Sequence, residues 1–394
     1  MMKKFLLLPI IVLSTVIVNA QWHEPSAVAS NSQNVYALAS DGTTIYAGTG
    51  GAGISVSSNN GSSWTASNNG FTGSGVSTLA ISGTNVYAGD NEVFLSTNNG
   101  LLWTSVSSGL PTTTINTLFI NGTDIFAGTN GGVYKSSNNG TLWTAANSGF
   151  TSQVVTLAAS GSNLFFGAPN NGVYKSVNNG GSWTKVINGL TNIDVHSLAV
   201  SGTSIFAGTS GGIFLSTNNG TNWTAVNNGL TNLNVYTLLI NGTNMYAGTD
   251  DGVFYSNDNG SVWTSNNDGF PANTAVQALA ISGTTLFAGI RLYPYGVWIR
   301  PLSEIKTDIA DNKENTSFAV YPNPASTNII VNGNDTKNSD ALMNVYNVIG
   351  SLVKSEKLKE NNQTVSISDL PNGIYIVEMK SNDFIKSQKL IIKK

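Results

Sequence analysis

The sequence contains no cysteine in 394 residues, which excludes disulfide bonds, thiolate catalysis and cysteine-ligated metals. Charged residues make up only 10%, and the formal net charge is −3. Because affinity for nucleic acids comes largely from clustered Lys and Arg, we expect no nucleic-acid partner. Histidine occurs only at His23 and His196, so there is no metal signature. No Gly-rich phosphate loop lies between a strand and a helix, and no cofactor is expected.

Long apolar runs are absent as well, except at the N-terminus. There Lys3 and Lys4 precede a mostly apolar run at residues 5–18, which ends near the small residue Ala20. This run is too short to span ~30 Å of hydrocarbon comfortably. The pattern therefore predicts a signal peptide at residues 1–20 rather than a membrane anchor, and no transmembrane segment after its cleavage.

Glycine is abundant, at 42 residues, and much of it belongs to a repeat. The pattern Ser-x-Asx-x-Gly-x-x-Trp returns every 39 or 40 residues and ends at Trp64, Trp103, Trp143, Trp183, Trp223 and Trp263. About 40 residues is the length of one four-stranded propeller blade. Each unit divides into four short β-rich runs, with Gly, Asn and Ser at the turns and no helical periodicity. The sequence therefore predicts an all-β fold, a β-propeller.

The first two runs of each unit have constant features. The first carries apolar residues at both parities, as in Val195–Val200, so we expect it to be covered on both faces. The second ends in a small pair such as Ala207-Gly208, which predicts close approach of neighbouring sheets. His196 falls within a first run, and we expect it to be packed or hydrogen-bonded rather than a ligand.

The number of blades follows from two counts. The first-strand leucine occurs seven times, at Leu38, Leu79, Leu118, Leu157, Leu198, Leu238 and Leu279, but the box tryptophan occurs only six times. Trp22 lies 16 residues before Leu38, and the internal Trp-to-Leu distances are 14 to 16. Residues 21–23 thus have the register of a fourth strand. We expect them to pair beside Trp298 and to close a seven-bladed ring, which removes exposed sheet edges.

The repeat motif resembles the Asp-box of sialidase-like (BNR) propellers. Ser256–Trp263 matches Ser-x-Asp-x-Gly-x-x-Trp in full, and the other five boxes carry Asn in place of Asp. The resemblance covers residues 21–305, and its group includes sialidases, some xyloglucan-degrading glycosidases and many non-enzymatic propellers. It implies that the box is a structural hairpin staple away from the active face. Sialidases use three arginines, and only Arg291 and Arg300 are present, so that activity is not expected.

Four acidic residues are expected on the loops that join second to third strands. Asp90 and Glu92 lie in the second unit, and Asp250 and Asp251 lie in the sixth, nearly across the ring. Glycosidases need two carboxyl groups roughly 5–10 Å apart. These residues are therefore alternative catalytic candidates, although solvated turn residues are the simpler interpretation.

The same loop of the last unit is longer than in the other units. It brings Arg291, Tyr293 and Tyr295 to the rim that holds Asp250 and Asp251. A cation, two aromatic rings and a few polar groups suit a sugar or peptide site, so these five are the candidate ligand-binding residues. The alternative is that the insertion only seals the closing blade.

The C-terminal part has a different composition. Residues 306–316 are polar and charged and are predicted to be a linker. Residues 317–394 contain seven short strand-like runs, which predict a small Ig-like β-sandwich.

This tail closely resembles the type A C-terminal sorting domain of the type IX secretion system of Gram-negative bacteria. The matching stretches, in order, are Tyr321–Pro324, Asn344–Gly350, Leu370–Tyr375 and Lys389–Lys394. The resemblance implies recognition by the secretion machinery through residues 317–394 and a final location in the medium or on the outer cell surface. An ordinary appended sandwich is the alternative.

Together these features predict a secreted propeller that acts as a carbohydrate- or protein-binding or scaffold module. A surface rich in neutral Asn, Ser and Thr suits hydrogen-bonded contacts to glycans, and a surface protein is the other partner considered. An extracellular glycoside hydrolase with loop-face carboxylates is the alternative function.

Overall fold

The computed structural model describes residues 21–23, 34–148, 150–292, 295–305, 318–333, 341–347, 350–358, 362–380 and 385–394. The chain divides into two compact units, residues 1–308 and 309–394. The predicted signal peptide and the predicted linker, residues 1–20 and 306–316, lie outside the described residues. The boundaries assigned to these segments therefore stay predictions.

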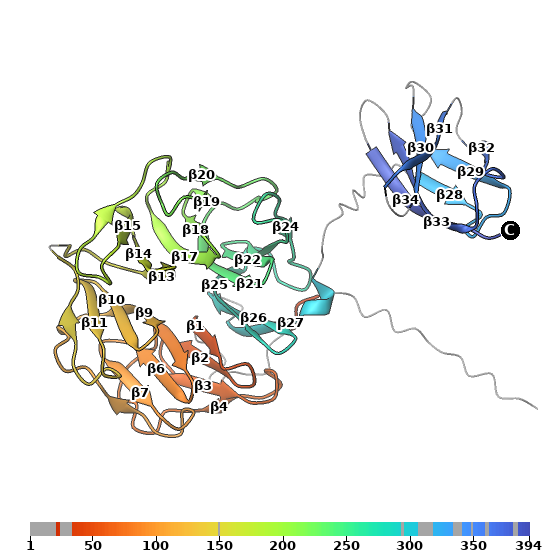
Figure 1. Cartoon of the computed structure of the whole chain (residues 1–394). Coiled ribbons are helices and arrows are strands. Elements are labelled where there is room, and N and C mark those ends of the chain that lie inside the picture. The colour runs from red at the N-terminus through yellow and green to blue at the C-terminus, as the bar shows by residue number, and fades with distance from the viewer. Residues whose placement is uncertain are drawn as a thin grey trace, which may run out of the picture. The chain divides into compact units, whose positions relative to one another are not determined.

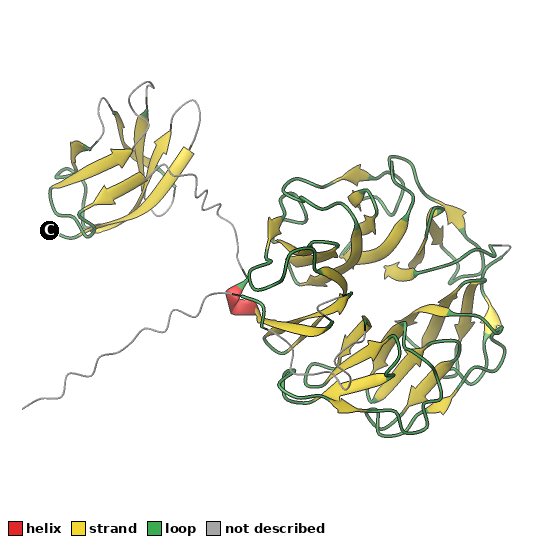
Figure 2. Ribbon diagram, turned by 180° about the vertical axis from the view of Figure 1, so that it is seen from behind, coloured by secondary structure: helices red, strands yellow, loops and turns green. Residues whose placement is uncertain are grey.

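The described residues of the first unit form seven antiparallel sheets, or blades, arranged in a ring (Figure 1). Figure 2 shows the same ring from behind, built almost wholly of strands and loops. The first three blades are β1 (Val35–Ser40), β2 (Ile45–Thr49), β3 (Ile54–Ser57) and β4 (Thr65–Ala66); β5 (Thr78–Ser82), β6 (Asn85–Gly89), β7 (Val93–Ser96) and β8 (Thr104–Ser105); and β9 (Ile115–Asn121), β10 (Asp124–Thr129), β11 (Gly132–Ser136) and β12 (Thr144–Ala145).

Blades four to seven follow the same order. They are β13 (Thr156–Ser160), β14 (Asn163–Ala168), β15 (Gly172–Ser176) and β16 (Thr184–Lys185); β17 (Val195–Ser201), β18 (Ser204–Thr209), β19 (Gly212–Ser216) and β20 (Thr224–Ala225); β21 (Val235–Asn241), β22 (Asn244–Thr249), β23 (Gly252–Ser256) and β24 (Thr264–Ser265); and β25 (Ala275–Ser282), β26 (Thr285–Arg291) and β27 (Gly296–Pro301). A short 3-10 turn, η1 (Leu302–Glu304), ends the unit.

The first strands follow one another around the ring. Each contacts the first strand of the next blade, and β25 contacts β1. Glycine at the end of the second strand permits this approach, because a Cβ at Gly208 would lie 2.8 Å from Cγ1 of Val235 in the next blade. The same holds where the ring closes, between Gly289 and Val35 of blade one. The predicted β-propeller is confirmed, and its small residues lie where neighbouring blades approach closely, as the sequence predicts.

The N-terminal segment completes blade seven. His23 pairs antiparallel with Ile299, to whose carbonyl its N–H donates at 3.0 Å. The Trp22 indole N–H donates to the carbonyl of Asn266 at 2.6 Å. The Trp22 ring stacks on Phe270 with centroids 4.6 Å apart. The predicted closure by this segment is confirmed, although one bridge replaces a full fourth strand.

The first strands are less buried than their sequences suggest. In β17, Val195 and Leu198 are buried, but His196 and Ala199 are only half-buried. In β18, every residue after Ser204 is buried. In β25 and β13, by contrast, buried residues occupy both parities. The predicted coverage of both faces therefore holds in some blades and is only partial in others such as blade five. Partial burial follows from the place of the first strand at the edge of its sheet, whereas the second has a strand on each side.

The tryptophan boxes of blades two to six join each of these blades to the one before it. In blade three the Ser136 hydroxyl donates to Asn138 Oδ1 at 2.8 Å and accepts the Gly140 N–H at 2.9 Å. The Trp143 indole then donates to the carbonyl of Val106 in blade two at 2.8 Å. The equivalent three bonds occur in blades two, four, five and six. The boxes are structural, as the sequence predicts.

The second unit is a sandwich of two antiparallel sheets. One contains β28 (Phe318–Tyr321), β29 (Asn328–Gly333) and β32 (Gln363–Ser366), and the other contains β31 (Leu352–Lys357), β30 (Leu342–Asn347), β33 (Gly373–Lys380) and β34 (Ile385–Ile392). Buried residues such as Val345, Val377 and Leu390 form its core. The predicted β-sandwich is confirmed. Among the described residues, no helix is long and apolar enough to cross a membrane.

Candidate functional site

In five blades, the first strand contains a β-bulge near its start. In blade five, Val195 and Ser197 pair with consecutive residues of β18, which leaves His196 outside the ladder. The bulged residues are Tyr36, Asn116, His196, Tyr236 and Gln277. A bulge redirects a side chain, and bulges are enriched beside functional sites. We call the end of the ring where the first strands begin and the second strands end the mouth.

At the mouth, Tyr236 connects two predicted ligand-binding residues. Its hydroxyl donates to Asp250 Oδ1 at 2.7 Å, and the Arg291 guanidinium lies over its ring, 5.8 Å from the centroid. Asn234 Nδ2 donates to Asp250 Oδ2 at 2.6 Å and to the Tyr236 hydroxyl at 2.9 Å. Burial, and next the bond to Asp250, raise the pKa of Tyr236. Tyr236 was not identified as a site residue from the sequence. It could have been found from its repeat position, which is the same as that of His196.

His196 extends this arrangement into blade five. Its ring lies 5.7 Å from that of Tyr236, and its Nε2 lies 2.8 Å from Ser210 Oγ. The Ser210 hydroxyl donates to Asp194 Oδ2 at 2.6 Å, so His196 Nε2 is the donor to Ser210. Burial lowers the pKa of His196, although Asp194 and Asp250 oppose the shift. The histidine is therefore neutral at neutral pH and does not act as a base toward Ser210. Its predicted hydrogen-bonded role is confirmed.

The inserted loop of blade seven contacts both of its neighbours. Arg291 lies over Tyr236 of blade six, while the Leu292 N–H donates to Asn34 Oδ1 of blade one at 2.9 Å. Leu292 has a φ of 71°, a left-handed conformation that is unusual for leucine. Of the two tyrosines in this loop, Tyr293 lies outside the described residues and Tyr295 is half-buried. The bond from Leu292 to Asn34 joins blade seven to blade one, as expected if the insertion seals the closing blade. The same loop also holds Arg291 at the mouth.

The other acidic candidates belong to local turns. The Asp251 N–H donates to Thr249 Oγ1 at 3.1 Å. Asp90 Oδ2 accepts the Ser74 N–H at 2.9 Å, and Glu92 accepts from the Ser105 hydroxyl at 2.5 Å. Asp90 and Glu92 line one cavity of about 290 Å³, whose walls come from residues 72–94 alone. That cavity therefore brings together the two acids of blade two but neither acid of blade six.

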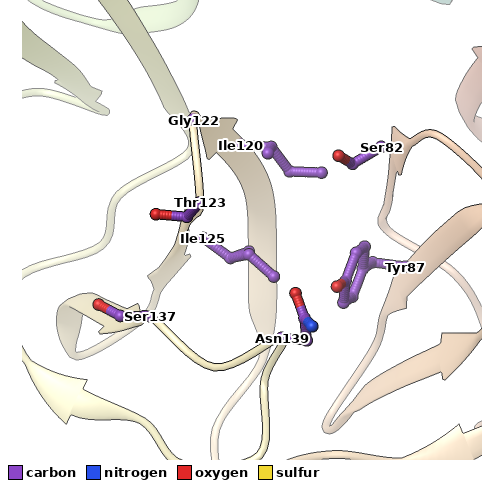
Figure 3. A pocket seen from close by; sticks show the side chains of 8 residues that line it. All are labelled: Ser82, Tyr87, Ile120, Gly122, Thr123, Ile125, Ser137 and Asn139. Atoms are coloured by element: carbon purple, nitrogen blue, oxygen red, sulfur yellow. The ribbon is translucent and has the colours of Figure 1, made fainter.

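A second cavity, of about 280 Å³, lies between blades two and three at the turn that joins β9 to β10 (Figure 3). Tyr87, Ile120, Ile125 and Asn139 are among its walls, and none of its lining residues is charged. It therefore offers no carboxylate pair of the kind that a glycosidase uses. Within the described ranges, no cluster of three His, Asp or Glu side chains could hold a metal ion.

Two protein families match separate parts of the chain. Residues 319–393 match the secretion system C-terminal sorting domain, and residues 167–286 match the DUF6242 beta propeller domain. No curated protein matches the sequence.

Solved structures of similar shape confirm the propeller fold. YCF48 bound to D1 peptide shares 13% identity, with 69% of this chain and 94% of that chain covered and a TM-score of 0.55. PorZ, a surface component of the type-IX secretion system of Porphyromonas gingivalis, shares 13% over 93% of this chain and 60% of that chain, with a TM-score of 0.51. The GH74 enzyme of Niastella koreensis shares 18% over 68% and 43%, with a TM-score of 0.52.

The chain is thus an all-β protein that joins a propeller to a sorting domain of the type IX secretion system. It is secreted or attached to the cell surface, and its tail interacts with the secretion machinery, as the sequence predicts. At these low identities the structural likeness shows only the fold.

Proposed function

We propose that the propeller is a binding module whose ligand docks at the mouth of blades five to seven. The observation that carries the proposal is the fixed position of Tyr236, held by Asp250 and Asn234 and covered by Arg291. An aromatic ring held by hydrogen bonds presents a rigid face at little entropic cost, and polar groups around it fix orientation. A carbohydrate or a protein segment suits such a surface.

The candidate ligand-binding residues remain Arg291, Tyr293, Tyr295, Asp250 and Asp251. The test is a glycan array combined with a pull-down from outer-surface extracts, performed with the full chain. We expect the signal to be lost in the double variant Tyr293→Ala/Tyr295→Ala and in Arg291→Ala. Asn241→Ala, at an exposed residue on the end of β21 opposite the mouth, is the control. Unchanged binding in all variants would refute this site.

We also place the propeller in the Asp-box group. The support is the shared geometry of its boxes, in which Asp258 makes the same bond to its serine as Asn138 does. The group contains both enzymes and binding proteins, so membership does not determine the function. The function has to be argued from the residues at the mouth.

A glycoside hydrolase is the second candidate, favoured by the cavity that Asp90 and Glu92 share. The test is release of reducing sugars from polysaccharides. We expect Glu92→Gln to abolish any turnover while Asp251→Asn preserves it. Activity that persists in Glu92→Gln would exclude this carboxylate as a catalytic residue.

A further inference from the structure

Seven residue pairs occupy equivalent positions around the mouth. Each pair joins the residue at the bulge position, or its equivalent in blades two and four, to the residue 14 positions later, at or just beyond the end of the second strand. We call them the mouth pairs: Tyr36/Gly50, Ser77/Asn91, Asn116/Asn130, Val155/Pro169, His196/Ser210, Tyr236/Asp250 and Gln277/Arg291.

Three mouth pairs share one geometry. Asn116 Nδ2 donates to Asn130 Oδ1 at 3.0 Å, and the bonds between His196 and Ser210 and between Tyr236 and Asp250 span the same 14 residues. One backbone arrangement therefore presents an amide, an imidazole or a phenol, depending on the blade.

The residues of the mouth pairs differ from blade to blade, whereas the box residues and the second-strand glycine do not. The serine, glycine and tryptophan of the box recur in six blades, and the glycine that ends the second strand recurs in all seven. Those positions recur because equivalent packing demands the same residue in every repeat. At the mouth pairs, packing is equivalent but the residue changes. Variation at a fixed geometry is typical of positions that contact something outside the fold.

The pairs and their neighbours form a nearly continuous surface. Contacts between mouth side chains or loops cross five of the seven junctions between blades. They are Gln153 Nε2 to Asn116 Oδ1 at 3.5 Å, Asn170 N to Asp194 Oδ1 at 3.3 Å, the rings of His196 and Tyr236 at 5.7 Å, Arg291 over the Tyr236 ring at 5.8 Å, and Leu292 N to Asn34 Oδ1 at 2.9 Å.

The chemistry of this surface is mainly neutral. The mouth pairs contain one cation and one carboxylate, Arg291 and Asp250, and the other polar members are amides, hydroxyls and an imidazole whose pKa is lowered by burial.

We infer that the mouth pairs form one recognition ring for a neutral oligosaccharide, extending from Tyr236 and Arg291 to the amides of blade three and to Tyr36. This inference rests on the proposed function and narrows its ligand class. Sugar hydroxyls both donate and accept, which matches amides and hydroxyls, and pyranose faces stack on aromatic rings. A protein interface usually has an apolar centre that is poor in charged residues. The amides of blade three do not supply such an apolar centre.

The test is calorimetric titration of the full chain with cellohexaose, xylohexaose and mannohexaose. Hexagalacturonate and a library of acidic and neutral peptides form the other arms. The far-side variants are Asn116→Ala/Asn130→Ala and Tyr36→Ala, and the near-side variant is Tyr236→Phe/Arg291→Ala. Asn241→Ala, an exposed amide at the opposite end of a first strand, is the matched control.

We expect at least one neutral hexasaccharide to bind, with Kd at least tenfold weaker in both far-side variants and within twofold of wild type in the control. Loss confined to the near-side variant would overturn the ring while leaving the proposed function intact. Binding of hexagalacturonate or peptides alone would overturn the ligand class only. Absence of binding in every arm would overturn both proposals.

Discussion

Trp22 donates its indole N–H to the backbone carbonyl of Asn266, 244 residues further along the chain, at 2.6 Å. The same tryptophan is 2% exposed and shares a core with Trp298. The two ends of the propeller chain are therefore joined inside blade seven. Because every blade packs on two neighbours only when the ring is closed, this contact stabilises the whole domain rather than one sheet.

Replacement of Trp22 by alanine is expected to open the ring. Loss of a buried tryptophan costs about 3–5 kcal/mol of unfolding free energy, a large part of the stability of a typical domain. Urea denaturation followed by tryptophan fluorescence measures the change. Leu101→Ala, at a side chain 73% exposed, is the control and should cost less than about 0.5 kcal/mol. Equal stability of the two variants would contradict closure by this segment.

Two substitutions of the box residue Asp258 are expected to change the free energy of unfolding by different amounts. Asp258 Oδ1 accepts from the Ser256 hydroxyl at 2.7 Å and from the Val262 N–H at 3.0 Å. An asparagine oxygen accepts both, so Asp258→Asn should change stability by less than about 0.5 kcal/mol, whereas Asp258→Ala should cost about 1–2 kcal/mol. Thermal unfolding distinguishes them, and an equal loss in both variants would show that the charge matters.

Asp124 predicts a stability change in acid. Burial alone would raise its pKa, but hydrogen bonds from Lys135, Ser137 and Asn179 outweigh that effect and lower the pKa to about 2. The stabilisation is present above the usual carboxyl range and is lost as pH falls through about 4 toward 2. We expect Asp124→Asn to lose about 1 kcal/mol at pH 7 and to show a flatter dependence below pH 4. Parallel acid-unfolding curves for variant and wild type would contradict this role.

His196 predicts a change in a higher pH window. Its pKa is lowered by burial, so the unfolded chain takes up the proton first as pH falls through about 6.5. Folding stability from this residue is therefore present above that value and declines below it. His196→Gln should reduce the loss of stability between pH 7 and pH 5, measured by urea titration. A steeper decline in the variant would show that the charged imidazole is favoured in the fold.

Asn323 predicts a link between sandwich packing and export. Its Nδ2 donates to the carbonyl of Lys389 at 2.6 Å, and its Oδ1 accepts the Ile391 N–H at 2.9 Å, so it joins the segment after β28 to β34. Asn323→Ala should weaken the sandwich by about 1–2 kcal/mol and reduce the fraction of protein at the cell surface. Asn372→Ala, which removes one exposed bond to Lys394, is the control. Surface immunoblotting measures export. Normal export of Asn323→Ala would show that sorting does not depend on this contact.

Some elements follow directly from local patterns. All seven strand-like runs of the tail contain a strand, because alternation of apolar residues and the turn residues between them act over a few positions. The boxes and small pairs behave in the same way, since a fixed repeat must pack equivalently each time. The predicted coverage of the first strands holds in β25 but is only partial in β17, because apolar residues at both parities do not distinguish an edge strand from an inner one.

The mouth shows the opposite case. Arg291 and Asp250 were identified from loop position, but Tyr236 was not, because its importance depends on a bulge that the sequence does not mark. The catalytic candidates Asp90 and Glu92 share a cavity, yet that cavity holds no residue of the distant unit. Side-chain direction at a bulge depends on the register between two strands.

The repeat period, the closing segment and the sorting tail can be read from the sequence alone, because each is encoded in residues a few positions apart or in a repeated spacing. Which side chains meet at the mouth depends on three-dimensional packing. Contacts such as Arg291 over Tyr236 and Leu292 with Asn34 join different blades. Their geometry arises from how neighbouring sheets pack around the ring, which no local pattern specifies.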